Sequence, residues 1–283
     1  MSQPNPILWK ANQLWLKARC YLSPSKAFAY PLMSGARFVA HMDDRSSHDI
    51  YIKGNYEAKE IQWCSQWLQD GDAFLDCGAN IGYYSACLPQ LKALSKVVAV
   101  EGNWTCHERC RKTFDLLSIP NITLIHAILH SDSGQSLYIP DMPGQEGLQH
   151  ISSAKNGSNS CKSMTLDQLV LEEGFHPALI KVDCEGAETE ILKGASGLLE
   201  DIRPAWLIEI NDNALVRSGT SREELFGILK EASYRFFHIS SAFEDHPAGV
   251  EIDTSFKSWS FNMAVIPDDL DNHRRWAQSL HGS

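Results

Sequence analysis

The sequence predicts an α/β domain built on a doubly wound, mostly parallel seven-stranded sheet with an antiparallel hairpin at its C-terminal edge. From residue 73 onwards, short apolar segments of strand length alternate with segments of helical periodicity. That alternation is typical of a parallel sheet covered by helices on both faces. Two late strand segments, 234–240 and 261–267, have no helical segment between them, and they predict the edge hairpin.

The N-terminal part is expected to form an extension over residues 1–55, followed by the main domain over residues 56–283. Residues 7–22 have the pattern of an amphipathic helix, whose Trp and Leu side chains pack on the main domain or on a membrane surface. Polar and apolar residues alternate over residues 49–53, which predicts a short strand. Apolar residues then recur at helical spacing from residue 61 to residue 68.

The main domain repeats a strand and a helix several times along the chain. Besides the two late segments, the predicted strands cover residues 73–80, 96–103, 122–129, 179–186 and 205–212, and the predicted helices cover residues 81–88, 107–117, 187–199 and 221–232.

The repeat is interrupted by a Ser-, Gly- and Asn-rich segment over residues 141–163, which predicts a flexible loop. A loop of this length inside a compact domain is either functional or disordered. It is therefore either a flap near the active site or a disordered excursion, and residues 131–140 are expected to lead into it as a hairpin.

Composition and charge exclude several classes of protein. The formal net charge of −10 argues against a nucleic-acid binder that follows the phosphate backbone. No apolar run approaches the ~20 residues of a membrane span, and the N-terminus lacks the pattern of a secretory signal. The eight Cys residues form no C-x-x-C pair, which indicates reduced thiols and a cytoplasmic location.

The first candidate site is the segment DCGANIG, residues 76–82, which follows a buried strand and opens a helix. Gly78 and Gly82 allow a tight turn, and the free N–H groups of a helix start can bind a carboxylate or a phosphate. Asn80 stands where the dinucleotide fingerprint G-x-G-x-x-G requires its second glycine, so the segment argues against a nicotinamide cofactor.

An acid at the end of the next strand indicates which ligand this turn would hold. Glu101 lies 19 residues after Gly82, where a carboxylate can accept hydrogen bonds from both hydroxyls of a ribose. A ribose clamp without a phosphate motif indicates S-adenosylmethionine, and Asp76 could hold the ammonium group of that cofactor directly or through water. The alternative is that both acids cap turns at their strand ends.

The second candidate site is LIKVDCEGAETEIL, residues 179–192, where an apolar strand ends in a group of carboxylates. Asp183 and Glu185 follow the strand directly. Glu188 and Glu190 come later and are expected to be acids of a helix start, since carboxylates favour the first turn of a helix. Lys181 is expected to point to the opposite side of the strand or to pair with one of the acids.

Three segments together resemble the FkbM family of S-adenosylmethionine-dependent methyltransferases. These are FLDCGANIGYYS (74–85), MTLDQL (164–169) and IKVDCEGAETEILKGA (180–195), and the likeness covers roughly residues 50–240. The resemblance implies the class I, Rossmann-like methyltransferase fold. It also implies an O-methyltransferase that acts on a hydroxyl of a small-molecule acceptor, a sugar or a secondary metabolite of natural-product biosynthesis.

The resemblance also implies where the cofactor binds. In the family's strand order the first and fourth strands are neighbours, so both candidate sites would meet at the carboxyl edge of the sheet. Tyr56 and Glu57 could close over the cofactor or form a plain turn. Gly102 and Trp104 depart from the family's E-P-N-P segment. The expected cofactor-binding residues are Asp76, Gly78, Ala79, Asn80, Gly82, Tyr83, Glu101, Gly102, Asn103, Ala127 and Asp183.

Methyl transfer requires a donor and an acceptor at attack distance and a group that takes the acceptor proton. Holding the reactants in place can supply ~7–11 kcal/mol, and a carboxylate can take the proton. Asp183 is the expected base or acceptor-orienting group, followed by Glu185 and Glu209. Clustering is expected to raise the pKa of one of these acids.

Alternatives remain open at this stage. Asp183, Glu185, Glu209 and Asn211 could instead hold Mg²⁺ or Ca²⁺, which prefer oxygen ligands, although a metal is not favoured. The acceptor could be an amine or a carboxylate rather than a hydroxyl. The chain could also be a non-catalytic S-adenosylmethionine-binding protein.

Overall fold

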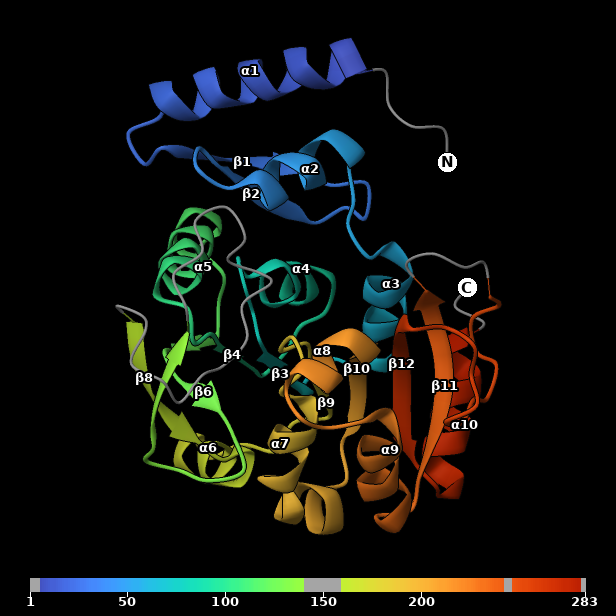
Figure 1. Ribbon diagram of the computed structural model, residues 1–283. Helices are drawn as coiled ribbons and strands as arrows, with labels where there is room; N and C mark the ends of the chain where they lie inside the picture. The colour runs from blue at the N-terminus through green and yellow to red at the C-terminus, as the bar shows by residue number, and fades with distance from the viewer. Residues whose placement is uncertain (1–5, 140–158, 242–245, 281–283) are drawn as a thin grey trace.

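The sheet has the predicted architecture. A computed structural model describes residues 6–139, 159–241 and 246–280. Seven strands form one sheet in the order β11-β12-β10-β9-β3-β4-β5 (Figure 1). They are β3 (Ala73–Cys77), β4 (Lys96–Val100), β5 (Ile122–Ile125), β9 (Leu179–Val182), β10 (Ala205–Asn211), β11 (Tyr234–Ser241) and β12 (Ser260–Pro267). Strand β12 runs antiparallel to both β10 and β11, and the other neighbouring strands are parallel. The α/β class and the edge hairpin are confirmed.

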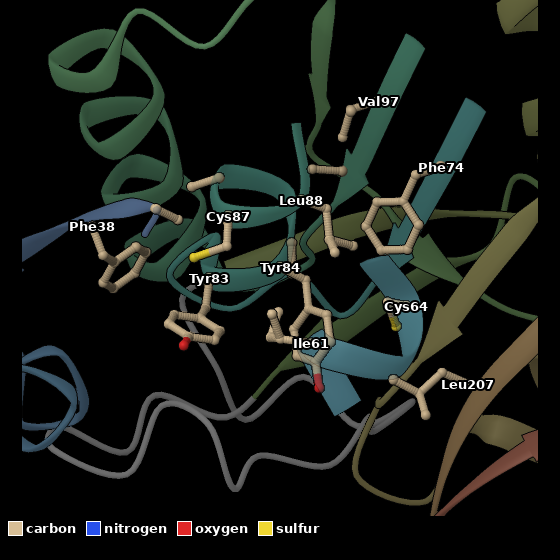
Figure 2. Packing of buried hydrophobic residues seen from close by; sticks show 14 of the residues in the cluster. Phe38, Ile61, Cys64, Phe74, Tyr83, Tyr84, Cys87, Leu88, Val97 and Leu207 are labelled. Atoms are coloured by element: carbon tan, nitrogen blue, oxygen red, sulfur yellow. The ribbon is translucent and has the colours of Figure 1, made fainter. Parts of the chain in front are cut away.

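Helices cover both faces of this sheet. Neighbouring residues of a strand point to opposite faces, so their side chains enter two different buried clusters, each of which also contains helix side chains. Phe74 of β3 belongs to one buried cluster and Leu75 to the other. Figure 2 shows Phe74 beside Leu88 on the first face. The first face carries α3 (Ala58–Trp67), α4 (Tyr83–Leu91), α5 (Trp104–Leu117) and α10 (Leu270–Leu280), and the second carries α6 (Leu166–Glu173), α7 (Glu188–Lys193), the π-helix η2 (Leu198–Ile202), α8 (Asp212–Arg217) and α9 (Arg222–Glu231). Burial of each such apolar side chain stabilises the fold by roughly 1.5–3 kcal/mol.

The N-terminal part packs on the first face of the sheet. It consists of α1 (Pro6–Leu22), the antiparallel hairpin β1 (Ala27–Pro31) and β2 (Arg37–His41), and α2 (Arg45–Lys53). The Phe38 ring of β2 lies 5.1 Å from the Tyr83 ring of α4, and both are labelled in Figure 2. Because side chains of both parts form one buried cluster, the boundary at residue 55 remains a proposal.

The strand predicted over residues 49–53 is wrong, because this segment lies in α2. Asp44 caps the start of this helix, accepting a hydrogen bond from the Ser47 N–H at 2.6 Å. Gly54, in the left-handed conformation, ends it. The two caps outweigh the polar–apolar alternation.

Three further strands form a small separate sheet and correct two predictions. They are β6 (Ile128–Leu129), β7 (Ser136–Ile139) and β8 (Asn159–Met164). The strand predicted over 122–129 is therefore divided between two sheets. The loop predicted over 141–163 is shorter, because its last residues belong to β8, where Cys161 joins a small apolar cluster. Residues 141–158 of that loop lie outside the described residues.

The helix predicted over residues 187–199 is also divided. It consists of α7 and η2, which are separated at Gly194. A Cβ atom at Gly194 would lie 2.5 Å from the His130 carbonyl oxygen, so glycine permits a close approach at this break. Over the described residues, the structure contains no helix with both the length and the apolar character needed to cross a membrane.

The carboxyl ends of β3 and β9 lie side by side, as the expected strand order requires. The two strands pair in parallel, with Leu75 opposite Ile180. Directly after β3, Gly78 has a φ of +78°, and a Cβ atom there would lie 2.0 Å from the Asp183 carbonyl oxygen. The two candidate motifs therefore touch through their backbones at this glycine.

We expect Gly78→Ala to destabilise the protein by about 3 kcal/mol or more, because it adds a backbone clash to the cost of a positive φ. The measurement is the free energy of unfolding in urea. Gly71→Ala is the matched control, since Gly71 has a φ of +91° and open space around it, and should cost only ~1–2 kcal/mol. Equal costs for the two variants would contradict the close approach.

Candidate active site

A cavity of about 790 Å³ opens at the carboxyl ends of β3, β4, β9 and β10. Its volume lies within the range of small-molecule sites, roughly 300–1,000 Å³. Ten of the residues selected from the sequence line it: Gly78, Asn80, Glu101, Gly102, Asn103, Ala127, Asp183, Glu185, Glu209 and Asn211. The structure therefore brings the two motifs together around one cavity.

Four of the expected cofactor-binding residues lie behind the cavity wall. The buried Asp76 accepts hydrogen bonds at Oδ2 from the backbone N–H (3.2 Å) and hydroxyl (2.6 Å) of Ser85. Its Oδ1 has no hydrogen-bond partner among the residues that the structure describes. Ala79 donates its N–H to the Val100 carbonyl, a Cβ on Gly82 would clash with the Phe114 ring, and the Tyr83 hydroxyl accepts the Tyr56 N–H. Asp76 and Tyr83 flank the turn over residues 78–82 (the glycine turn), and Ala79 and Gly82 belong to it. The contacts of all four residues help to hold this turn in place.

Glu101 is fixed at the cavity wall by two backbone groups. Its Oε1 accepts the Asn103 N–H and its Oε2 accepts the Asn80 N–H, each at 2.7 Å. Burial raises the pKa of Glu101 to about 7, although these two hydrogen bonds oppose the increase. Each carboxylate oxygen has a second lone pair. The carboxylate can therefore accept hydrogen bonds from two neighbouring hydroxyls of a ligand.

Three carboxyl groups meet at the other end of the cavity. Oxygen atoms of Asp183, Glu185 and Glu209 lie within 4.8 Å of one another. The nearby Asp183 charge, together with burial, raises the pKa of Glu209 to about 11, and a hydrogen bond joins the two groups. Burial, together with the charge of Asp183, raises the pKa of Glu185 to about 8. At neutral pH, Glu209 therefore keeps its proton and donates it in a hydrogen bond to Asp183.

Lys181 keeps Asp183 ionised. Its Nζ lies 2.9 Å from Asp183 Oδ2 and 4.8 Å from the centre of the Tyr84 ring. Burial alone would raise the pKa of Asp183, but the Lys181 charge and the hydrogen bonds from Glu209 and Lys181 together lower that pKa below its usual value. Despite its own burial, Lys181 has a raised pKa because of the charges on Asp183, Asp76 and Glu57. Of the two expectations for Lys181, pairing with an acid is confirmed.

The turn over residues 183–188 (the acid turn) holds these carboxyl groups in place. Glu185 and Gly186 have positive φ values of 52° and 105°. Glu188 lies in the first turn of α7, as expected, and its Oε1 accepts the N–H groups of Cys184 (2.9 Å) and Gly186 (3.2 Å). Glu188 thus closes the turn, a role that goes beyond the helix-start position predicted from the sequence.

The N-terminal part supplies cavity residues that were not selected from the sequence. Asp43, Asp44, Arg45 and Ser46 line the wall at the start of α2. Arg109 of α5 holds this segment through ion pairs with Asp43 (3.4 Å) and Asp44 (3.5 Å). Asp44 is a residue type that often caps a helix, so the sequence could have predicted the start of α2. It could not have predicted that this helix start lines the cavity.

Tyr56 and Glu57 also line the cavity, and the start of α4 holds them there. The Tyr84 hydroxyl donates to Glu57 Oε2 at 2.6 Å. Burial raises the pKa of Glu57 to about 7, while the Lys181 charge opposes that increase. Helix α4, which follows the glycine turn, therefore holds Tyr56 and Glu57 in place at this side of the cavity.

The acids could also serve as metal ligands. The oxygen atoms of Asp183, Glu185 and Glu209 are close enough together to surround one divalent cation. Asn211 is engaged elsewhere, since its Oδ1 caps α8 by accepting the Ala214 N–H at 3.2 Å. The Lys181 ammonium lies 2.9 Å from Asp183 Oδ2, so a cation bound by Asp183 would lie beside another positive charge.

Comparisons with known proteins show which family this chain belongs to. The methyltransferase FkbM domain matches residues 76–236, a range that contains both the glycine turn and the acid turn. Hexuronic acid methyltransferase AglP of Haloferax volcanii is 31% identical over 178 residues, covering 62% of this chain and 69% of that protein.

Two solved structures are also similar. The methyltransferase FkbM from Methylobacillus flagellatus KT has 18% identity and a TM-score of 0.44, covering 70% of this chain and 44% of that chain. Precorrin-6y C5,15-methyltransferase from Geobacter metallireducens GS-15 has 12% identity and a TM-score of 0.45, covering 76% and 89%. Since the family model spans more than half of the chain and both edges of its cavity, this protein belongs to the FkbM family of methyltransferases.

Proposed function

We propose that this methyltransferase uses S-adenosylmethionine to methylate a hydroxyl of a small-molecule acceptor of the sugar type. The observation that carries the proposal is that one cavity is lined both by a fixed carboxylate, Glu101 after β4, and by the Asp183–Glu209 pair at β9 and β10, on the other side of β3. The first suits a ribose, and the second suits a hydroxyl that must lose a proton.

The cofactor end is proposed from the geometry around Glu101. Its carboxylate would accept the ribose hydroxyls, while Gly102, Ala127 and Ile128 line the wall beside it. S-adenosylmethionine supplies a methyl group that is already activated by the positive charge on sulfur. The many carboxylates of the wall favour such a cation. Asp76 lies behind the wall, so we propose that it acts on the ammonium group through water.

The acceptor end is proposed from the charge state of the acids. Asp183 is ionised and accepts a hydrogen bond from the protonated Glu209, and Lys181 fixes its orientation. A carboxylate held in this way can orient an acceptor hydroxyl and take its proton as the methyl group is transferred. Glu185 lies within reach of the same acceptor.

Support for a sugar-type acceptor comes from the name of the relative AglP, a hexuronic acid methyltransferase. The acidic wall gives some support to a second candidate, an amine acceptor, because it attracts cations. A hexuronic acid carries a carboxylate as well as hydroxyls, so the name of this relative also supports a third candidate, methylation of a carboxylate. A cytoplasmic site of action is part of the proposal, since all eight Cys residues are free thiols.

Glu101→Ala should raise the Kd for S-adenosylmethionine by at least about tenfold, because it removes two hydrogen bonds to a charged group. Isothermal titration calorimetry measures this change. Asp115→Ala, which removes an exposed acid of α5, is the matched control and should leave the Kd unchanged. An unaltered Kd in a folded Glu101→Ala variant would contradict the ribose clamp.

Asp183→Asn should lower kcat by roughly 100-fold or more, because it removes the proton acceptor. The Kd for S-adenosylmethionine should stay within about threefold, a change of under ~1 kcal/mol. The assay follows S-adenosylhomocysteine release with a panel of hydroxylated acceptors. Glu190→Gln, in α7 but outside the cavity wall, should keep full turnover.

The same assay in EDTA separates proton transfer from metal binding. Full turnover after chelation is the expected result. Loss of turnover that Mg²⁺ restores would make Asp183 a metal ligand and contradict its proposed role. An Asp183→Asn variant with unchanged kcat would remove this residue from the mechanism altogether.

With Asp183 as the base, kcat/KM for the acceptor at saturating S-adenosylmethionine should stay level from about pH 8 down to about pH 6. A base must be deprotonated, and the Lys181 charge with the hydrogen bonds from Glu209 and Lys181 lowers the pKa of Asp183. Saturation with the cofactor keeps the titration of Glu101, whose pKa is about 7, out of the profile. If Glu185 were the base, kcat/KM would instead fall below its pKa of about 8. A pH profile of kcat/KM distinguishes the two acids, and a decline near pH 8 that Glu185→Gln abolishes would exclude Asp183.

A further inference from the structure

One face of α1 carries apolar side chains that stay exposed among the residues that the structure describes. The helix buries Leu16 and Cys20 completely, in the cluster that also holds β1 and β2 side chains. On the other side, Leu14 is 71% exposed, Tyr21 is 65% exposed and Leu22 is 82% exposed. These residues share a face, because positions separated by three, four, seven or eight residues align along a helix.

The exposed face includes an open apolar depression. Lys17, Ala18, Tyr21 and Leu22 of α1 line it together with Met42, the residue that follows β2. In Figure 1, α1 is the outermost helix of the N-terminal part, on the far side of the hairpin from the main sheet. The depression therefore lies where another surface can reach it. We call the face formed by Leu14, Lys17, Ala18, Tyr21, Leu22 and Met42 the α1 face.

The charge around the α1 face is opposite to that of the rest of the protein. Residues 1–42 contain five basic residues and no Asp or Glu, although the whole chain has a net charge of −10. Lys17 lines the depression. The Lys26 ammonium lies 4.1 Å from the centre of the Tyr21 ring. The face thus combines apolar side chains with ammonium groups, the pattern of a helix that lies on a membrane surface.

The charge also distinguishes between possible occupants. Symmetric pairing with a second copy would place Lys17 and Lys26 near the same residues of the other copy, which like charges oppose. An anionic bilayer instead offers negative headgroups to the ammonium groups and an apolar interior to Leu14 and Leu22.

We propose that the α1 face docks this methyltransferase on an anionic lipid bilayer. Docking there would bring the bilayer close to the active cavity, because Met42 lies in the depression while the next residues, Asp43 and Asp44, line the cavity wall. An acceptor held at the lipid surface would then be presented to the cavity. The docking step is independent of the proposed function and can be tested without methyl transfer.

The test is co-sedimentation of the full chain with phosphatidylcholine vesicles, with and without phosphatidylglycerol. The protein should partition onto the anionic vesicles and not onto pure phosphatidylcholine. Lys17→Glu and Leu22→Ser should each lower the partition coefficient, the former by roughly tenfold because it reverses a charge at the surface. Added salt should weaken the binding.

Matched control variants lie at the opposite end of the molecule, in α9 and α6 (Figure 1). Lys230→Glu reverses an exposed charge, and Leu171→Ser removes a leucine that is 81% exposed. Both should bind anionic vesicles like the unmodified protein. All four substitutions alter exposed side chains, and an unchanged circular dichroism spectrum and urea unfolding midpoint verify that each variant is folded.

Three outcomes would overturn the proposal. The first is equal binding to neutral and anionic vesicles. The second is a loss of binding that is the same for the α1 variants and the control variants. The third is an absence of vesicle binding, together with a dimer in sedimentation velocity that Leu22→Ser dissociates, which would assign the face to a second copy of the chain.

Discussion

The buried ammonium group of Lys181 is the interaction on which the site depends. It lies at the end of β9, is almost completely buried, and pairs with Asp183 at 2.9 Å. Its charge also acts on Asp76 beneath the glycine turn and on Glu57 in the cavity wall. Removing one partner from a buried group of charges typically costs about 3–5 kcal/mol, because the remaining charges lose their compensation. One side chain therefore stabilises the acids contributed by three separate segments.

The same charge affects the protonation of the neighbouring acids, among them the proposed base. Next to Lys181, Asp183 stays ionised, and its negative charge keeps the proton on Glu209. The acid turn then keeps this arrangement in place, since Glu188 accepts two of its backbone N–H groups. The result is a carboxylate with a fixed direction and a fixed charge, which a flexible surface acid could not provide.

Local sequence patterns predicted the sheet and both motifs, because alternating apolar segments and glycine-rich turns depend on neighbouring residues. They failed at one helix with overlooked caps and at a part of the cavity that depends on distant contacts. The segment over 49–53 alternates like a strand but is helical because Asp44 and Gly54 cap it. Asp43 and Asp44 reach the cavity through ion pairs with Arg109, more than sixty residues away, which no spacing reveals.

The contact between Gly78 and the Asp183 carbonyl has a mechanical consequence. There is no space between the glycine turn and the acid turn, so neither backbone can shift toward the other. The spacing between the glycine turn and the acid turn, where we propose that donor and acceptor bind, is therefore set by main-chain packing, and only its fine adjustment is left to side chains. Substitutions in the cavity wall could then change which acceptor binds, while the distance between the two turns stays the same.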